Sequence, residues 1–224
     1  MTSRGRSGVA AIVATAAAAL AAPAVPASAA GSCSLQIPST VRISTPYQAV
    51  TGRLSSNCSA AGATDASWSV YHPTEGINSY LFFHPSTTDI WDVYDWDVTP
   101  ARYSWRPEGA YDADYNNIAQ NSPITDVRVS SGAAIYTSRS GSYVTIKTSS
   151  SRYAYSVSEW VRWGNIRGTI QYYGSAGWTS LKYAYQDANG YYTYRFYAPR
   201  GRSYRVVLAS TSSIWGSVSA SSYR

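Results

Sequence analysis

A two-residue alternation in the second half of the chain constrains the possible fold more than any other feature. Residues 141–149 read GSYVTIKTS, which places Val144 and Ile146 on one face of an extended segment and polar side chains on the other. Residues 191–199, YYTYRFYAP, alternate in the same way. Successive side chains of a β-strand point to opposite faces, so this period is typical of strands with one buried face.

Turn signals separate these segments at short intervals. DANG at 187–190 combines an Asp, which can bond its own backbone, with a Gly, which adopts a positive φ, and RGRS at 200–203 supplies another turn. Residues 167–174 and 178–186 are expected to form a hairpin. In the first half the strand candidates are TVRIST, AVTGRLS, ASWSVYHP, NSYLFFHP and TDIWDVYDWDV. Short strands separated by turns predict an all-β fold of two immunoglobulin-like β-sandwich domains.

Composition agrees with this class of fold. The chain holds 21 Tyr and 8 Trp but has 13% charged residues, against about 25% in typical globular proteins. Aromatic side chains suit a pleated, half-buried sheet surface.

Charge divides the chain into two parts. Residues 31–122 carry four basic and nine acidic side chains, whereas residues 123–224 carry twelve basic and three acidic ones. With the polar segment NNIAQNSPITD between them, this asymmetry predicts an acidic β-sandwich domain over 30–122 and a basic immunoglobulin-like β-sandwich domain over 123–224. Solvated surfaces that differ in composition without functional meaning would give the same pattern.

The first 29 residues match a cleaved secretory signal peptide. Arg4 and Arg6 precede the apolar run 9–20, and ASA at 27–29 fits the small-x-small cleavage rule. Twelve apolar residues are fewer than the roughly 20 that span a bilayer. We therefore expect a secreted, extracellular protein without a membrane span.

Cys33 and Cys58 are the only cysteines. An exported chain meets oxidising conditions, so a disulfide between them is expected, tying the first strand to a neighbouring one. Closing a loop of this length stabilises a fold by roughly 3 kcal/mol. The alternative is a lipidated Cys33 at the cleavage point, although the preceding AGS lacks the large apolar residue of such signals.

The stretch 178–210, WTSLKYAYQDANGYYTYRFYAPRGRSYRVVLAS, resembles a repeat of secreted actinobacterial proteins with bacterial immunoglobulin-like domains. The repeat runs from a Trp-Thr strand through an Asp-x-x-Gly turn to an aromatic strand and a Tyr-Arg-Val strand. The matching residues are Trp178, Thr179, Asp187, Gly190, Tyr192, Tyr204, Arg205 and Val206. The resemblance covers roughly residues 143–218. It implies an immunoglobulin-like fold and little about activity, because such domains mostly serve as uncharacterised modules or spacers.

Asp112, Asp114 and Asn116 place three oxygen-bearing side chains at every second position and form a candidate calcium site. The pattern begins like an EF-hand loop, yet Asn117 stands where that loop needs Gly and Pro123 where it needs Glu. Either a looser calcium site or a solvated loop whose side chains cap turns fits these residues.

The aromatic residues Trp91, Tyr94 and Trp96 lie beside acids and are candidate ligand-binding residues, because exposed rings stack on sugars. Two of the acids, Asp95 and Asp97, would lie about 7 Å apart on one strand face, which also allows glycosidase chemistry. Core or cross-strand packing is the alternative role for the rings.

Arg195, Arg200, Arg202 and Arg205 cluster in sequence around one turn, with tyrosines between them. Arginines beside aromatic rings bind phosphates and anionic polymers. In an exported protein the expected partners are extracellular glycans, cell-wall polymers or another secreted protein, and no nucleic acid is expected. Edge-strand protection by charge is the alternative.

Catalytic motifs are missing from the sequence. His72 and His84 are each followed by Pro, and neither a G-x-S-x-G nor an H-E-x-x-H pattern occurs. We expect no catalytic residues and no cofactor, with calcium as the open alternative. The sequence therefore predicts a secreted, non-enzymatic extracellular binding or structural protein; the alternative is a calcium-stabilised carbohydrate- or cell-wall-binding module.

Overall fold

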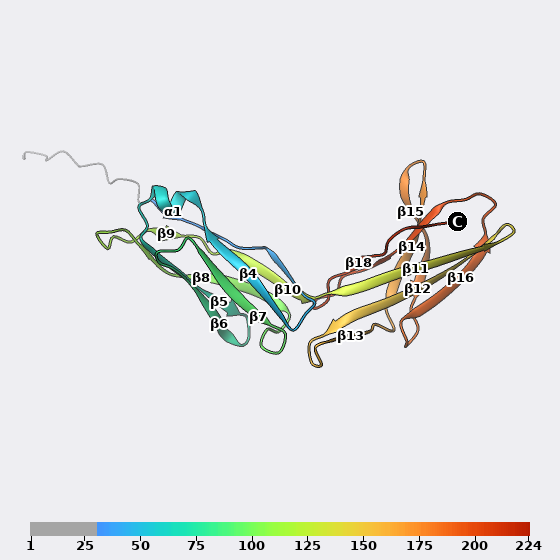
Figure 1. Ribbon diagram of the computed structural model, residues 1–224, viewed down its shortest axis with the longest axis horizontal. Helices are drawn as coiled ribbons and strands as arrows, with labels where there is room; N and C mark the ends of the chain where they lie inside the picture. The colour runs from blue at the N-terminus through green and yellow to red at the C-terminus, as the bar shows by residue number, and fades with distance from the viewer. Residues whose placement is uncertain (1–30) are drawn as a thin grey trace, which may run out of the picture.

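The computed structural model describes residues 31–224 as two β-sandwiches arranged end to end (Figure 1). The predicted all-β, immunoglobulin-like class is thus confirmed. The predicted signal peptide lies outside the described residues. Within those residues, no helix is both long and apolar enough to cross a membrane.

The amino-terminal sandwich packs a five-stranded sheet, in the order β3-β10-β8-β5-β6, against a three-stranded sheet, β2-β4-β7. A short parallel pair, β1-β9, closes one end. The elements are β1 (Ser32–Cys33), β2 (Leu35–Gln36), β3 (Thr40–Ile43), β4 (Tyr47–Leu54), α1 (Ser56–Ala60), β5 (Asp65–His72), β6 (Gly76–Phe83), β7 (Thr88–Tyr94), β8 (Ala101–Tyr111), β9 (Ala119–Gln120) and β10 (Ile124–Val129).

Tryptophans fill the core between these two sheets. Trp68, Trp91 and Trp105 are fully buried, and the Trp91 and Trp105 rings meet edge to face at 5.5 Å between centroids. Trp68 and Trp105 alternate with polar neighbours, and Trp91 lies between Ile90 and Asp92, so burying the tryptophan face of each strand buries no charged side chain next to it.

The carboxy-terminal sandwich places β11, β12 and β16 in one sheet, with β13 beside one end of β12. The facing sheet runs β15-β14-β17 and continues into β18 and β19. The strands are β11 (Ser131–Ser140), β12 (Tyr143–Ala154), β13 (Glu159–Arg162), β14 (Arg167–Gly174), β15 (Gly177–Tyr185), β16 (Tyr191–Tyr197), β17 (Ser203–Leu208), β18 (Ser217–Val218) and β19 (Ser222–Tyr223). The expected hairpin is β14-β15.

The change from one group of sheets to the other falls later than the predicted boundary at residue 122. Strand β10 begins at Ile124, yet it pairs in parallel with β3 and antiparallel with β8. Its Val127 and Val129 are buried in the amino-terminal core. The boundary was placed by charge, and surface charge does not report which sheet an alternating strand joins. The two sandwiches instead meet at Ser130.

Direct contacts join the two sandwiches. Ser130 is the single residue between β10 and β11, and its N–H donates to the Ile43 carbonyl at 2.8 Å. Tyr153, from β12, packs into the amino-terminal core. The indole Nε1 of Trp215 donates to the Val41 carbonyl at 3.1 Å. We call this contact region the joint; in Figure 1 it lies between the two groups of sheets.

The predicted disulfide between Cys33 and Cys58 is confirmed, and lipidation of Cys33 is contradicted because its sulfur is committed to the bridge. The expected neighbour was a strand, but the bridge ties β1 to the short helix α1. The helix was missed because five residues are too few to show a helical period.

Candidate functional site

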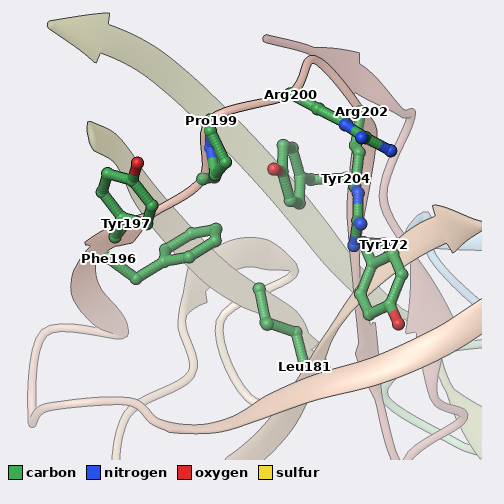
Figure 2. A pocket seen from close by; sticks show the side chains of 9 residues that line it. Tyr172, Leu181, Phe196, Tyr197, Pro199, Arg200, Arg202 and Tyr204 are labelled. Atoms are coloured by element: carbon green, nitrogen blue, oxygen red, sulfur yellow. The ribbon is translucent and has the colours of Figure 1, made fainter. Parts of the chain in front are cut away.

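A pocket of about 420 Å³ opens at the end of the carboxy-terminal sandwich farthest from the joint. Figure 2 shows its lining, and we call it the distal pocket. The strand register explains this position. Strand β16 ends at Tyr197, which pairs with Tyr143 at the start of β12, and the other end of β12 lies at the joint. The end of β16 is therefore at the opposite end of the sandwich from the joint. The lining residues are Tyr172, Leu181, Phe196, Tyr197, Ala198, Pro199, Arg200, Arg202 and Tyr204.

Four strands and one loop build the distal pocket. Strands β14, β15, β16 and β17 each contribute a side chain, and residues 198–202 link β16 to β17 along one side. The Arg139 guanidinium holds this loop by donating to the carbonyls of Ala198, at 2.6 Å, and Arg200, at 3.0 Å. A side chain at Gly201 would approach the Tyr223 hydroxyl to 2.3 Å, so the loop needs Gly there for close packing.

Two arginines supply positive charge to the distal pocket. The Arg202 guanidinium lies 4.6 Å from the centre of the Tyr172 ring. Neither Arg200 nor Arg202 forms an ion pair within residues 31–224. Figure 2 shows both on one side of the pocket, with Phe196 on the other.

Among residues 130–224, the acidic side chains lie away from the distal pocket. Residues 130–224 contain eleven basic side chains and two acidic ones, Glu159 and Asp187. Glu159 of β13 pairs with Ala154 of β12. The backbone N–H of Asp187 donates to the carbonyl of Tyr191, which pairs with Ser149 of β12. Both acids therefore lie in the half of the sandwich near the joint. From Ser149 to the distal end at Tyr143 the strand spans about 20 Å, which exceeds the screening length of physiological salt.

The Tyr204 side chain places an unpaired donor in the distal pocket. Its ring is buried, at 1% exposure, and its hydroxyl has no hydrogen-bond partner among the described protein atoms. Burial raises the pKa of Tyr204, an effect that the nearby positive charges of Arg202 and Arg139 partly offset. The hydroxyl therefore stays protonated at neutral pH and can donate a hydrogen bond.

The four arginines predicted to form one cluster are divided among three surfaces. Arg200 and Arg202 line the distal pocket. Arg195 lies over the Tyr143 ring, at 4.8 Å, on the outer face of the β11-β12-β16 sheet. Arg205 lies over Trp178, at 4.2 Å, on the outer face of the opposite sheet, because its neighbours Tyr204 and Val206 point inward.

Two similar pairs escaped sequence reasoning. Arg162 lies over Tyr191 at 4.6 Å, and Arg167 lies over Tyr183 at 4.9 Å. Each pair joins residues from different strands, so nothing local in the sequence marks it. The arginine–aromatic pairs of this sandwich are Arg162–Tyr191, Arg167–Tyr183, Arg195–Tyr143, Arg202–Tyr172 and Arg205–Trp178.

The aromatic candidates of the amino-terminal sandwich divide as well. Trp91 is fully buried and donates to the Asn78 side chain at 3.1 Å, so its prediction as a ligand-binding residue is wrong. It lies on the inward face of β7, and its neighbours Ile90 and Asp92 point outward. Tyr94 and Trp96 remain exposed, and Tyr47 from β4 joins them, with ring centroids 5.1 and 5.4 Å apart. We call these three rings the aromatic strip.

Asp95 and Asp97 do not form a catalytic carboxylate pair. Strand β7 ends at Tyr94, so the assumed strand alternation no longer holds beyond it. Asp95 is buried in the joint, where the Tyr153 hydroxyl donates to its Oδ2 at 2.5 Å, whereas Asp97 is exposed. A buried acid closed off by the other sandwich cannot reach a sugar.

The Asp112 side chain organises the loop after β8. Its Oδ1 accepts the backbone N–H groups of Asp114, at 3.0 Å, and Asn116, at 2.8 Å, and its Oδ2 accepts the Asn116 amide. The bond from the Asn116 side chain is the main reason that the pKa of Asp112 is lowered. Within residues 31–224, no three His, Cys, Asp or Glu side chains gather closely enough to hold a metal ion. This geometry is that of a turn cap.

The histidines lie in two different settings. The buried His72 accepts the backbone N–H of Glu75 through Nδ1 at 3.0 Å. The exposed His84 places Nδ1 2.8 Å from Asp65, beside a small hollow of about 140 Å³ that Ser67 also lines. Among the hydrogen bonds of residues 31–224, no hydroxyl reaches the Nε2 atom of either ring. A Ser-His-Asp relay would need that contact.

Comparison with models of known protein families finds no match, and no curated protein matches the chain. Among solved structures, the ligand-binding domain of human OSCAR is 12% identical, with a TM-score of 0.31 over 86% of this chain and 98% of that one. A tetra-tandem repeat from the extending region of a large adhesion protein is 11% identical, with a TM-score of 0.31 over 87% and 49%. The D0-D1 domain of intimin is 11% identical, with a TM-score of 0.27 over 85% and 96%. Similarity this low does not extend to function.

Proposed function

We propose that this protein is a secreted, non-enzymatic binding module whose carboxy-terminal sandwich holds acidic glycans outside the cell. The amino-terminal sandwich then acts as a packed spacer. The observation that carries this proposal is the set of five arginines, each over an aromatic ring and none with a carboxylate partner among residues 31–224.

An arginine stacked on a ring suits the capture of an anion. The ring takes one face of the guanidinium and restrains it, while N–H groups on its edge remain for a two-point contact with a carboxylate or sulfate. In Arg205 these are the two terminal amino groups, because its Nε donates to the Gln171 side chain at 2.8 Å. Eleven basic side chains against two acidic ones add an attractive field for a polyanion. Because the pairs occupy both outer faces as well as the distal pocket, a long polymer fits this distribution better than a single small ligand.

Export and the lack of enzymatic chemistry are parts of the same proposal. The Cys33–Cys58 disulfide is typical of exported proteins, and the signal-like leader agrees with it. The separated acids, and the two histidines whose Nε2 atoms meet no hydroxyl among residues 31–224, support a binding role over a hydrolytic one.

A salt-gradient measurement on immobilised polygalacturonate tests the proposal. We expect wild-type residues 30–224 to be retained on the resin. The double variant Arg195→Gln, Arg205→Gln should elute at a clearly lower salt concentration, because each substitution removes one arginine contact to the carboxylates of the polymer. The matched control is Arg53→Gln, Arg102→Gln, two exposed arginines of the amino-terminal sandwich, and it should elute close to wild type. Wild-type retention no greater than on uncharged dextran would reject the proposal.

The aromatic strip supports a second candidate, the binding of neutral sugars. Its exposed rings come from the start of β4, the end of β7 and the turn that follows β7, and the Tyr47 hydroxyl donates to Asp92 at 2.8 Å. Retention on uncharged dextran that disappears in Trp96→Ala would favour this surface over the arginine–aromatic pairs. A requirement for calcium would further favour a calcium-stabilised module.

A further inference from the structure

We infer that the distal pocket binds one carboxylated sugar residue, a uronic acid, of an acidic glycan. This inference rests on the proposed function and names the ligand class for one site within it. Three independent features of the pocket each specify a different part of such a ligand.

The charge of the pocket specifies an anionic group. Arg200 and Arg202 lie on the same side, in the loop 198–202, and the Arg202 guanidinium is restrained by Tyr172 (Figure 2). The two acidic side chains of this sandwich lie in its half near the joint and form no ion pair with either arginine, so they do not neutralise the pair. A planar carboxylate matches the fork of a guanidinium in a two-point hydrogen bond.

The apolar wall specifies a ring. Leu181 and Phe196 face the pocket, and Phe196 meets the Tyr204 ring edge to face at 5.9 Å. A pyranose presents C–H groups on its faces, and these pack against aromatic and aliphatic surface as other apolar groups do. A cavity of about 420 Å³ lies in the size range of small-ligand sites, roughly 300–1,000 Å³.

The Tyr204 hydroxyl specifies a hydrogen-bond acceptor away from the anionic end. It points from β17 toward the side where Phe196 and Pro199 lie (Figure 2). The hydroxyl oxygen is covered and unpaired, which is unfavourable, so a ligand hydroxyl that displaces the covering side chains and accepts from it gains affinity.

Other ligand classes leave one of these features unused. A neutral sugar does not engage the two arginines, an inorganic anion does not cover Leu181 and Phe196, and an aromatic acid without hydroxyl groups does not reach Tyr204. A sulfated sugar shares the anionic chemistry, but its tetrahedral group is bulkier than a planar carboxylate.

Titration calorimetry on residues 30–224 with trigalacturonate tests the inference. The comparison ligands are the carboxyl-reduced, neutral trisaccharide and a sulfated trisaccharide of the same length. We expect trigalacturonate to bind at least tenfold more tightly than either. The variant Arg200→Gln should weaken trigalacturonate binding at least tenfold. Its Tm should not change, because the Arg200 side chain forms no ion pair within residues 31–224.

Tyr204→Phe separates a binding role from a structural one. Removing an unpaired buried hydroxyl should leave Tm unchanged or higher, while the affinity for trigalacturonate falls about five- to tenfold. Arg53→Gln, in the amino-terminal sandwich, is the control and should bind trigalacturonate as wild type does. A Tyr204→Phe protein with wild-type affinity would overturn the pocket's assignment.

The remaining outcomes distinguish the inference from the proposed function. If polygalacturonate retains the protein but trigalacturonate does not bind, the pocket inference is overturned and the proposed function stands. Tighter binding of the sulfated trisaccharide would overturn the carboxylate assignment. If neither the polymer nor the trisaccharide binds, the proposed function is rejected as well.

Discussion

At the residue scale, the joint contains a hydrogen bond between Tyr153 and a buried carboxyl group. Its strand belongs to the carboxy-terminal sandwich, but its ring is buried in the other core, and its hydroxyl donates to Asp95 Oδ2 at 2.5 Å. The second oxygen of Asp95 has no hydrogen-bond partner among the described protein atoms. Tyr153 therefore provides a principal stabilising contact to a buried carboxylate. Burial, reinforced by that carboxylate, raises the pKa of Tyr153 to about 12.

Tyr153→Phe should lower the free energy of unfolding by roughly 2–3 kcal/mol at pH 7, because it removes the hydrogen bond to a buried carboxyl group. The measurement is urea unfolding followed by tryptophan fluorescence. Tyr136→Phe, at an exposed position, is the control and should leave stability unchanged.

The pH dependence of this difference has a definite sign. The folded-state pKa of Tyr153 is above its ordinary value of 10.0, so the stability contributed by the neutral hydroxyl is complete below pH 10 and is lost as pH rises toward 12. The difference in free energy of unfolding between wild type and Tyr153→Phe should therefore become smaller between pH 10 and pH 12. A gap that is absent at pH 7 would contradict this role for the hydroxyl.

At the scale of elements, the loop that joins β8 to β9 is held by one side chain. Asp112 accepts three hydrogen bonds from residues 114 and 116, whereas the Asp114 side chain forms no hydrogen bond among the described residues. The two acids, which look equivalent in sequence, are therefore unequal in the structure. A calcium site would need both, but a turn cap needs only Asp112.

Asp112→Ala should lower Tm, and Asp114→Ala should not, with the same difference in EDTA and in millimolar calcium. The measurement is differential scanning calorimetry at neutral pH. Because the folded-state pKa of Asp112 is below its ordinary value of 3.8, its contribution is present above that pH and disappears as pH falls through the lowered pKa. A calcium-dependent rise in Tm that either substitution abolishes would instead establish a metal site.

At the scale of the whole molecule, the joint determines how the distal pocket is presented. The Trp215 ring lies against the guanidinium groups of Arg128, at 4.3 Å, and Arg42, at 5.1 Å, and its indole N–H donates to the Val41 carbonyl. These contacts link the loop after β17 to the amino-terminal sandwich. The distal pocket lies at the end of the carboxy-terminal sandwich away from the joint, so the joint sets its orientation relative to the amino-terminal sandwich.

Trp215→Ala should loosen the joint without unfolding either sandwich. It removes the bond to Val41 and two cation–π contacts, each worth about 0.5–2 kcal/mol. Small-angle X-ray scattering should show a broader range of maximum dimensions, while the circular dichroism spectrum stays that of a β-protein. Trp96→Ala, which removes an exposed ring, is the control. Scattering curves that superpose with wild type would show that the other joint contacts suffice.

Local pattern was enough to find most strands. The alternation in 141–149 coincides with the first part of β12, and the strand–turn–strand pattern of 178–210 coincides with β15, β16 and β17. These predictions succeeded because the period of two depends only on neighbours along one strand. The prediction of Trp91 as an exposed, ligand-binding residue was wrong for the same reason. Alternation separates the two faces of a strand, but it does not say which face is covered.

The sequence by itself determined the all-β class, the two-sandwich plan and the disulfide, since these follow from side-chain period, turn residues and a single pair of cysteines. Only the tertiary structure decided that β10 joins the first sandwich, that Tyr153 enters the other core and that four arginines close in sequence face three directions. Strand partners are chosen by contacts between residues far apart in the chain. The distal pocket, made by four strands and a loop, exists only once those partners have met.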